Sequence, residues 1–201
     1  MSERPPEPPP NTLIAAVAFE GGIAVLAVVA GWLIGRRPLD EMHFGFRDLL
    51  LGLAAGLPPL LILVPCIRFP VGPLREMLRV VDELLTPLFR GCNLLDFAVI
   101  AVLAGLGEEM FFRSIVQEGL ASLMPGPVAV WIGLSFSAIL FGLAHWVTPA
   151  YGVIAGLIGA YLGGIWLWSG NLLVPIAAHA TYDFLALIYL VKLRRPQTQS
   201  P

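Results

Sequence analysis

Residues 94–124 read LLDFAVIAVLAGLGEEMFFRSIVQEGLASLM, an apolar stretch that carries two adjacent glutamates and an arginine, Glu108, Glu109 and Arg113. An ionisable side chain at the centre of a bilayer costs about 2.5–3.5 kcal/mol on insertion scales, so charged residues inside membrane helices usually serve a function. The alternative is a short helix that ends before the charges and leaves them among the lipid headgroups. The apolar run 97–107 has only eleven residues, which is too short to cross a bilayer and weighs against that alternative.

The composition of the whole chain indicates a membrane protein. Of its 201 residues, 57% are hydrophobic and 13% are charged, and the mean hydropathy is +0.81. Soluble domains contain about 25% charged residues. The net charge of −2 gives no indication of a nucleic-acid partner. Cys66 and Cys92 lack the spacing of a metal site and are interpreted as ordinary small apolar residues.

Apolar windows long enough for a membrane helix, about 20 residues, can be placed at six positions. They cover residues 12–35, 49–67, 94–121, 127–146, 150–168 and 171–191. Between the second and third windows, the segment 68–93 mixes four arginines with apolar residues, which is typical of an amphipathic helix at the membrane surface. We therefore expect an all-α, polytopic transmembrane bundle of about six spans plus this interfacial segment.

The chain divides into four parts on this interpretation. Residues 1–10 are proline-rich and polar, and we expect a disordered tail there, not a cleavable signal peptide. Residues 11–93 hold two transmembrane helices and the interfacial segment, residues 94–191 hold four helices, and residues 192–201 form a C-terminal tail. With the N-terminus in the cytoplasm, the inside segments carry eight lysines and arginines and the outside segments carry three. That excess favours both termini in the cytoplasm, although Arg36-Arg37 runs against it.

The charged cluster predicts two roles for its two glutamates. Glu109 and Arg113 stand four residues apart in the favourable acid-first order, so they share one helix face and can form an ion pair. Glu108 is rotated by about 100° from Glu109 and faces elsewhere. We expect the ion pair to fix the helix and Glu108 to remain free to react.

Two histidines within the apolar windows complete the pattern. His145, near the end of its window, is by itself typical of an interfacial residue, and His179 by itself could form a helix–helix hydrogen bond. His179 and Asp183 share a helix face, and Asp183 could orient the imidazole. Intramembrane polar groups usually face the bundle interior and pair with one another, so three helices carrying such groups predict one shared cavity.

A glutamate and a histidine can activate a water for attack on a carbonyl, and a second histidine can stabilise the oxyanion that forms. The chain contains no Gly-x-Ser-x-Gly nucleophile motif and no His-Glu-x-x-His zinc motif. The commonest serine and zinc routes to hydrolysis are therefore absent.

These motifs resemble the signature of the CPBP intramembrane proteases, which include the CAAX prenyl endopeptidases and the bacterial Abi-type proteins. The signature is Glu-Glu-x-x-x-Arg, then Phe-x-x-x-His, then His-x-x-x-Asn or Asp, and residues 108–113, 141–145 and 179–183 match it in order. The resemblance covers about residues 94–191, which we expect to be the catalytic core. It implies a glutamate-dependent intramembrane endopeptidase, multi-pass in a bacterial cell membrane.

The resemblance also implies a role for each motif residue. There are three pairs: Glu108 and His145 activate the water, His179 and Asp183 stabilise the oxyanion, and Glu109 and Arg113 support the site. Its expected partners are the lipid bilayer and a peptide or protein substrate. That substrate is the C-terminal region of a membrane-associated or lipid-bearing protein, or a bacterial sorting or bacteriocin-related peptide. The oligomeric state is left open.

Asp183 departs from the prenyl-protein enzymes, which resemble one another in having asparagine at this position. An ionised carboxylate cannot donate a hydrogen bond to an oxyanion. Either Asp183 is protonated in its desolvated surroundings, or it only orients His179. The departure questions a CAAX substrate more than the peptidase fold.

Three alternative functions remain open at this point. In a zinc peptidase, Glu108, His145 and His179 would form a His₂Glu metal shell, although we favour a mechanism without a cofactor. A transporter would also place acids and histidines in a bundle, but it predicts similarity between the halves of the chain, which we do not see. A non-catalytic membrane scaffold would retain the motifs for structure only.

Overall fold

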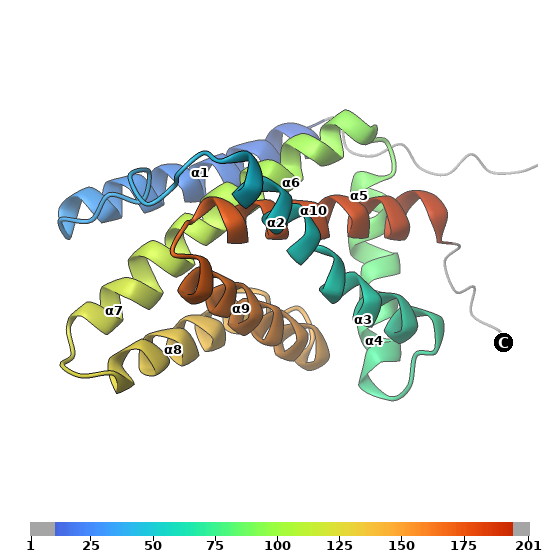
Figure 1. Ribbon diagram of the computed structural model, residues 1–201. Coiled ribbons are helices and arrows are strands. Elements are labelled where there is room, and N and C mark those ends of the chain that lie inside the picture. The colour runs from blue at the N-terminus through green and yellow to red at the C-terminus, as the bar shows by residue number, and fades with distance from the viewer. Residues whose placement is uncertain (1–10, 195–201) are drawn as a thin grey trace, which may run out of the picture.

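The computed structural model describes residues 11–194, and all the regular structure in this range is helical (Figure 1). Within residues 11–194, four helices are long and apolar enough to cross a membrane: Thr12–Leu33, Phe46–Arg68, Pro149–Ser169 and Leu173–Leu193. The predicted all-α membrane bundle is confirmed. The expected tail 1–10 and most of the tail 192–201 lie outside the described residues.

Each of the six predicted windows contains helix. The elements are α1 (Thr12–Leu33), α2 (Phe46–Ala55), α3 (Leu57–Arg68), α4 (Pro73–Val80), η1 (Val81–Leu85), α5 (Thr86–Phe89), α6 (Leu94–Glu109), η2 (Met110–Glu118), α7 (Gly119–Ser122), α8 (Val128–Ala144), α9 (Pro149–Ser169), α10 (Leu173–Leu187) and η3 (Ile188–Leu193). The η segments are π-helical continuations of the α-helices before them. At 17 residues, α8 is shorter than the four helices above.

Local sequence signals fix where the helices that carry the site begin and end. Asn93 caps α6 in a capping box, in which its side chain accepts from the Asp96 backbone N–H and Asp96 accepts from the Asn93 N–H. The Thr148 hydroxyl caps α9 by accepting from the Tyr151 N–H. Gly170 ends α9 in the left-handed region, with φ of 61°, a conformation that glycine adopts without a Cβ penalty.

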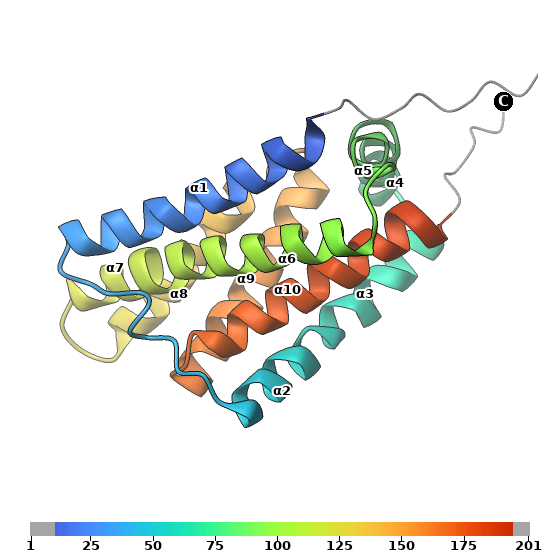
Figure 2. The same cartoon turned by 90° about the horizontal axis from the view of Figure 1, so that it is seen from above.

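The long helices form two layers that meet at α6 and α10. Seen from above, α1, α6, α10 and α2 lie side by side (Figure 2), and α8 and α9 pack on the other side of the α6–η2 helix and α10 (Figure 1). Glycines allow α6 to approach both neighbours. A Cβ on Gly105 would lie 2.8 Å from the Ile176 carbonyl of α10, and one on Gly107 would lie 2.8 Å from the Glu20 carbonyl of α1. The glutamates at the end of α6 therefore sit at the centre of the bundle.

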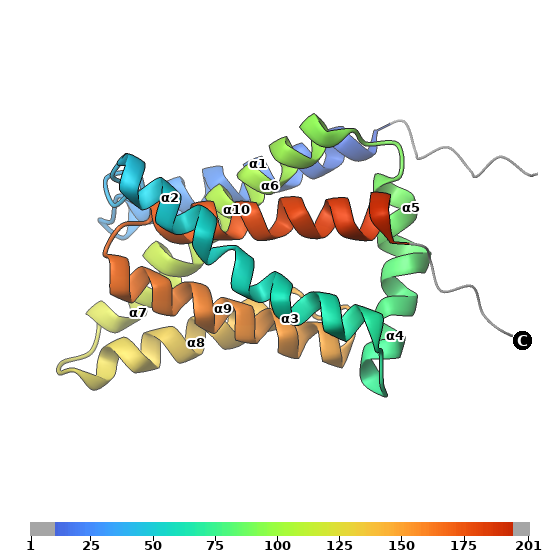
Figure 3. The ribbon, with the colours of Figure 1, turned by 45° about the vertical axis from the view of Figure 1, so that its right-hand side comes forward.

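The segment predicted to be an interfacial helix contains α4, η1 and α5, which cross one end of the bundle beside the end of α10 (Figure 3). In α4, Met77 and Leu78 are buried against neighbours that include Leu63 of α3, while Arg75 and Arg79 are exposed. The helix is amphipathic, as its sequence predicts, and its apolar face forms part of a cavity wall.

Candidate active site

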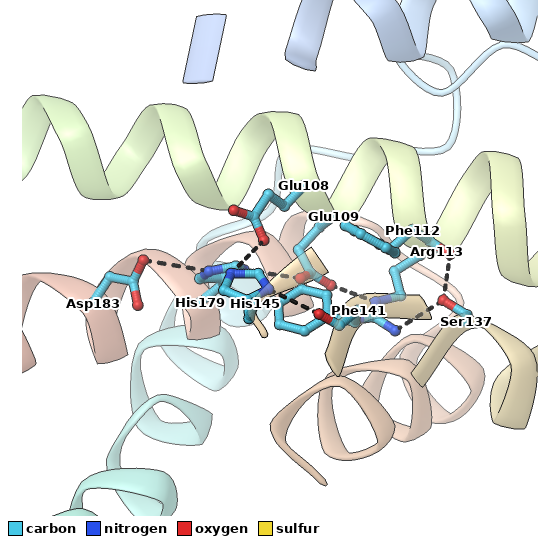
Figure 4. Close-up of polar contacts among 9 residues, drawn as sticks. All are labelled: Glu108, Glu109, Phe112, Arg113, Ser137, Phe141, His145, His179 and Asp183. Carbon is cyan, nitrogen blue, oxygen red and sulfur yellow. Dashed lines mark hydrogen bonds and ion pairs between the residues drawn. The ribbon is translucent and has the colours of Figure 1, made fainter. Parts of the chain in front are cut away.

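One cavity of about 290 Å³ lies between the two layers. Its titratable lining residues are Glu20 from α1, Glu108 from α6, His145 after α8, Tyr151 from α9, and His179, Tyr182 and Asp183 from α10. Four of the predicted site residues thus line one cavity, and Figure 4 shows their side chains gathered together. The remaining two, Glu109 and Arg113, are fully buried behind it.

Glu108 and His145 both line the cavity, and their side chains face each other there. His145 Nε2 lies 3.7 Å from Glu108 Oε2, which is longer than a hydrogen bond. That oxygen is buried and has no hydrogen-bond partner among residues 11–194. On its other side, His145 Nδ1 lies 2.9 Å from the Phe141 carbonyl oxygen. A carbonyl only accepts, so Nδ1 carries the proton, and in the neutral ring Nε2 presents its lone pair to Glu108.

Phe141 holds the His145 ring in this orientation. The two rings stack with their centroids 4.5 Å apart and their planes 17° apart. They lie one helical turn apart at the end of α8, where His145 is the first residue after the helix. The spacing of the Phe-x-x-x-His motif therefore has a direct structural reason, because it places the phenylalanine ring and carbonyl where both contact the imidazole.

His179 lies between two carboxylates. Its Nδ1 is 2.9 Å from Glu109 Oε1, and its Nε2 is 3.3 Å from Asp183 Oδ2. Because ionised carboxylates only accept hydrogen bonds, a ring protonated on both nitrogens satisfies both contacts. The Nε2–H is the one that faces the cavity-lining Asp183, which is partly exposed.

The carboxylate of Glu109 also pairs with Arg113, whose Nε donates to Oε2 at 2.6 Å. Both side chains are fully buried. Arg113 Nη1 contacts the Ser137 hydroxyl at 3.4 Å, and that hydroxyl donates to the Phe112 carbonyl at 2.8 Å. This network joins α6, η2, α8 and α10 behind the cavity and compensates the charge of the buried arginine.

The helix changes its winding directly at the site. The α-helix α6 ends at Glu109, and the π-helix η2 begins at Met110 and continues through Arg113. Short π-helical segments within α-helices occur frequently at functional sites.

Three features of the site were not anticipated from the sequence. The bond between Glu109 and His179 crosses from α6 to α10, and no local spacing signals it. The sequence does not single out Ser137 as a site residue, because a serine in an apolar helix usually forms a hydrogen bond with the backbone of its own helix. Glu20 could have been found, since it is an acidic residue inside the apolar window 12–35 and the insertion-cost argument applies to it too.

The arrangement does not fit the alternative zinc shell. Both ring nitrogens of His179 face carboxylates, so neither presents a free lone pair to a metal shared with Glu108 and His145. Among residues 11–194, no group of three or more histidine, cysteine, aspartate or glutamate side chains is arranged to hold a metal ion.

Ionisable side chains that gather around one cavity between apolar helices indicate a functional site within a membrane bundle. Residues 90–185 match the family model described as type II CAAX prenyl endopeptidase Rce1-like. This segment contains all three sequence motifs and supports the CAAX protease family, whose members are hydrolases. The four apolar helices of membrane-spanning length within residues 11–194 support an integral membrane protein. The chain has no significant match among curated proteins or among solved structures.

Proposed function

We propose that the protein is a glutamate-dependent intramembrane endopeptidase that uses no metal. The observation that supports this most directly is the pairing of Glu108 with His145 at the cavity wall. Their facing atoms, Oε2 and Nε2, are 3.7 Å apart, so one water can contact both. Such a water would have a base on each side, which is the arrangement that general-base activation needs.

The proposed reaction begins with a water between Glu108 and His145. Its oxygen attacks the carbonyl carbon of the scissile peptide, and its proton passes to Glu108. The carbonyl oxygen becomes an oxyanion, to which the Nε2–H of His179 donates. Glu108 then transfers its proton to the amide nitrogen, the C–N bond breaks, and a carboxylic acid and an amine are released.

Asp183 and Glu109 support the stabilisation of the oxyanion, because they hold the His179 ring from opposite sides. The Glu109 carboxylate is in turn held by Arg113. Asp183 thus acts through His179, as an orienting group.

The proposed substrate is a membrane-associated or lipid-bearing protein, or a sorting or bacteriocin-related peptide, cleaved at a bond that reaches the cavity. The cavity supports an apolar partner, because away from the polar cluster its walls are apolar. They include Leu63, Ile67, Met77, Leu78, Ile158 and Leu190. We further propose that the protein lies in a bacterial cell membrane. The distribution of lysine and arginine described above supports an orientation with both termini in the cytoplasm.

The test is an assay of purified wild type, Glu108→Gln and His145→Ala against candidate membrane peptides. We expect Glu108→Gln to lower kcat/KM by about 10²–10⁴-fold, because the base is lost. Glu83→Gln, a change at an exposed residue of η1, is the matched control and should retain wild-type activity. If the Glu108 and His145 variants cleave as fast as wild type, the assignment is wrong and a scaffold or transporter becomes the better interpretation.

A further inference from the structure

Thr86 of α5 lines the cavity, and the mechanism above does not use it. Among residues 11–194 it is the only polar cavity-lining side chain that is not titratable. It lies where η1 and α5 meet η3, at the end of the bundle that these segments cross (Figure 3). We call this end of the cavity the apolar arm, because the other side chains that line it from these elements are apolar: Val81, Leu85, Phe89, Leu190 and Val191.

The hydroxyl of Thr86 is buried without a partner. The residue is 4% exposed, and its Oγ1 has no hydrogen-bond partner within the described part of the chain. Buried polar side chains nearly always have one, because a hydroxyl left unpaired destabilises the fold. Thr181 shows the ordinary case, since its hydroxyl donates to the Ala177 carbonyl of its own helix at 2.7 Å. A valine would fill the place of Thr86 without this cost, so the hydroxyl indicates a partner that enters the cavity.

Polar contacts on both sides of Thr86 fasten its segment to the end of the last helix. Four residues before it, Asp82 forms a largely buried ion pair with Arg194. Four residues after it, the Arg90 carbonyl accepts from Lys192 Nζ at 3.1 Å. These contacts hold Thr86 in place on the cavity wall. Threonine in a helix populates two χ1 rotamers, so the hydroxyl can turn toward a bound molecule while the backbone stays where it is.

The chemistry of the apolar arm selects the molecule that it binds. A peptide segment suited to apolar walls has apolar side chains, yet it still carries main-chain N–H and C=O groups, which need hydrogen-bond partners when they are buried. A hydrocarbon chain fills the same space but carries no group to which a hydroxyl can bond. An apolar wall with one hydroxyl, that of Thr86, therefore favours a peptide segment.

We propose that Thr86 is a substrate-binding residue, whose hydroxyl forms a hydrogen bond with the main chain of an apolar peptide segment in the apolar arm. This inference rests on the proposed peptidase function and deepens it, because it specifies the part of the substrate that lies next to the scissile bond. Ile100 and Ala104 line the cavity between the start of α6 and Glu108. The three residues are spaced by four and share one helix face, so this face connects the arm with the catalytic glutamate. Thr86 takes no part in proton transfer.

Peptide binding tests this role without any cleavage. The probe is a fluorescently labelled peptide of alternating leucine and alanine, and the protein is the full chain with Glu108→Gln, which keeps the probe intact. Adding Thr86→Val should weaken binding about two- to tenfold, the loss expected for one neutral hydrogen bond. Adding Thr86→Ser, which keeps the hydroxyl, should not. The matched control is Thr181→Val, which should leave the affinity unchanged because the Thr181 hydroxyl bonds within its own helix. Dodecanol, a hydrocarbon probe, should bind equally well with and without Thr86→Val.

Stability and kinetics separate a binding role from a structural one. Because the hydroxyl has no partner within the described chain, Thr86→Val alone should leave the unfolding temperature in detergent unchanged or raise it. In the peptidase assay the same variant should raise KM and keep kcat within about twofold of wild type, the pattern of a lost binding contact. Thr86→Ser should restore KM.

Three results overturn the inference. They are equal peptide affinity with and without Thr86→Val, no binding of the peptide at all, and a clear fall in the unfolding temperature of Thr86→Val, which would make the hydroxyl a structural group. Cleavage at the wild-type rate by the Glu108 and His145 variants overturns the catalytic assignment instead. The binding measurement needs no cleavage, so it distinguishes that failure from a failure of the role of Thr86.

Discussion

His179 Nδ1 lies 2.9 Å from Glu109 Oε1, while the other oxygen of the same carboxylate accepts from Arg113 Nε at 2.6 Å. One buried carboxylate therefore connects the arginine of η2 to the histidine of α10. The sequence spacing predicts only the first of these contacts, the pair within one helix. The second means that Glu109 also fixes the ring that faces the cavity, so the support of the site and its histidine are parts of one network.

Glu109→Gln should destabilise the fold strongly. The substitution leaves the fully buried Arg113 guanidinium without a counter-charge, and breaking a buried ion pair by removing one partner costs about 3–5 kcal/mol. The measurement is denaturant or thermal unfolding of the detergent-solubilised protein.

The matched control for Glu109→Gln is Glu76→Gln. It removes an ion pair of similar length, the 2.6 Å contact between Glu76 and Arg79, but both of those side chains are exposed. Exposed pairs contribute little because water solvates the separated charges, so the control should barely change the unfolding midpoint. Equal shifts for the two variants would show that the buried pair does not stabilise the bundle.

Gly163→Ala should destabilise the buried network around Arg113, and Gly164→Ala should not. A Cβ on Gly163 would lie 2.5 Å from Gln117 Oε1 and 3.1 Å from Arg113 Nη1, whereas one on Gly164 meets nothing within 4 Å. Overpacking of this kind typically costs about 1–3 kcal/mol, and displacement of Arg113 should also reduce kcat/KM several-fold.

Gly164→Ala replaces a helical glycine without a collision, so we expect equal or slightly greater stability, because alanine loses less backbone entropy on folding. The two variants differ by one position in α9 and are compared in the same unfolding and activity assays. A Gly163→Ala protein as stable and as active as Gly164→Ala would indicate that the contact with Arg113 is freely accommodated.

The sequence predicts the all-helical fold and most of the cavity residues, but it does not predict which of these side chains contact one another across helices. Apolar length and the cost of buried charge locate the spans and single out Glu108 and His179, because both signals are local in the chain. Contacts between helices depend on how far each helix is rotated, which periodicity within one helix does not determine. The Glu109–His179 bond and the approach of Glu20 through Gly107 are of this second kind. At 17 residues, α8 is too short to be identified as a span by length, so the span expected at 127–146 stays a prediction.

Removal of metal should leave the activity unchanged. The proposed water is activated by Glu108 and His145, and the ring nitrogens of His179 are both directed at carboxylates. We expect the same kcat/KM before and after dialysis against a strong chelator. Activity that disappears with the chelator and returns with zinc would support the zinc peptidase instead.

Asp183→Asn should preserve most of the activity, whereas Asp183→Leu should not. Asp183 Oδ2 lies 3.3 Å from His179 Nε2, and an asparagine oxygen can accept from the same N–H while its amide group donates toward the cavity. We expect kcat/KM of the asparagine variant within about tenfold of wild type. Leucine removes the acceptor, so the His179 ring is then held from one side only, and we expect its kcat/KM to fall well below that of the asparagine variant. If the leucine variant matches the asparagine variant in kcat/KM at equal unfolding temperature, His179 is held by Glu109 alone and residue 183 does not orient the ring.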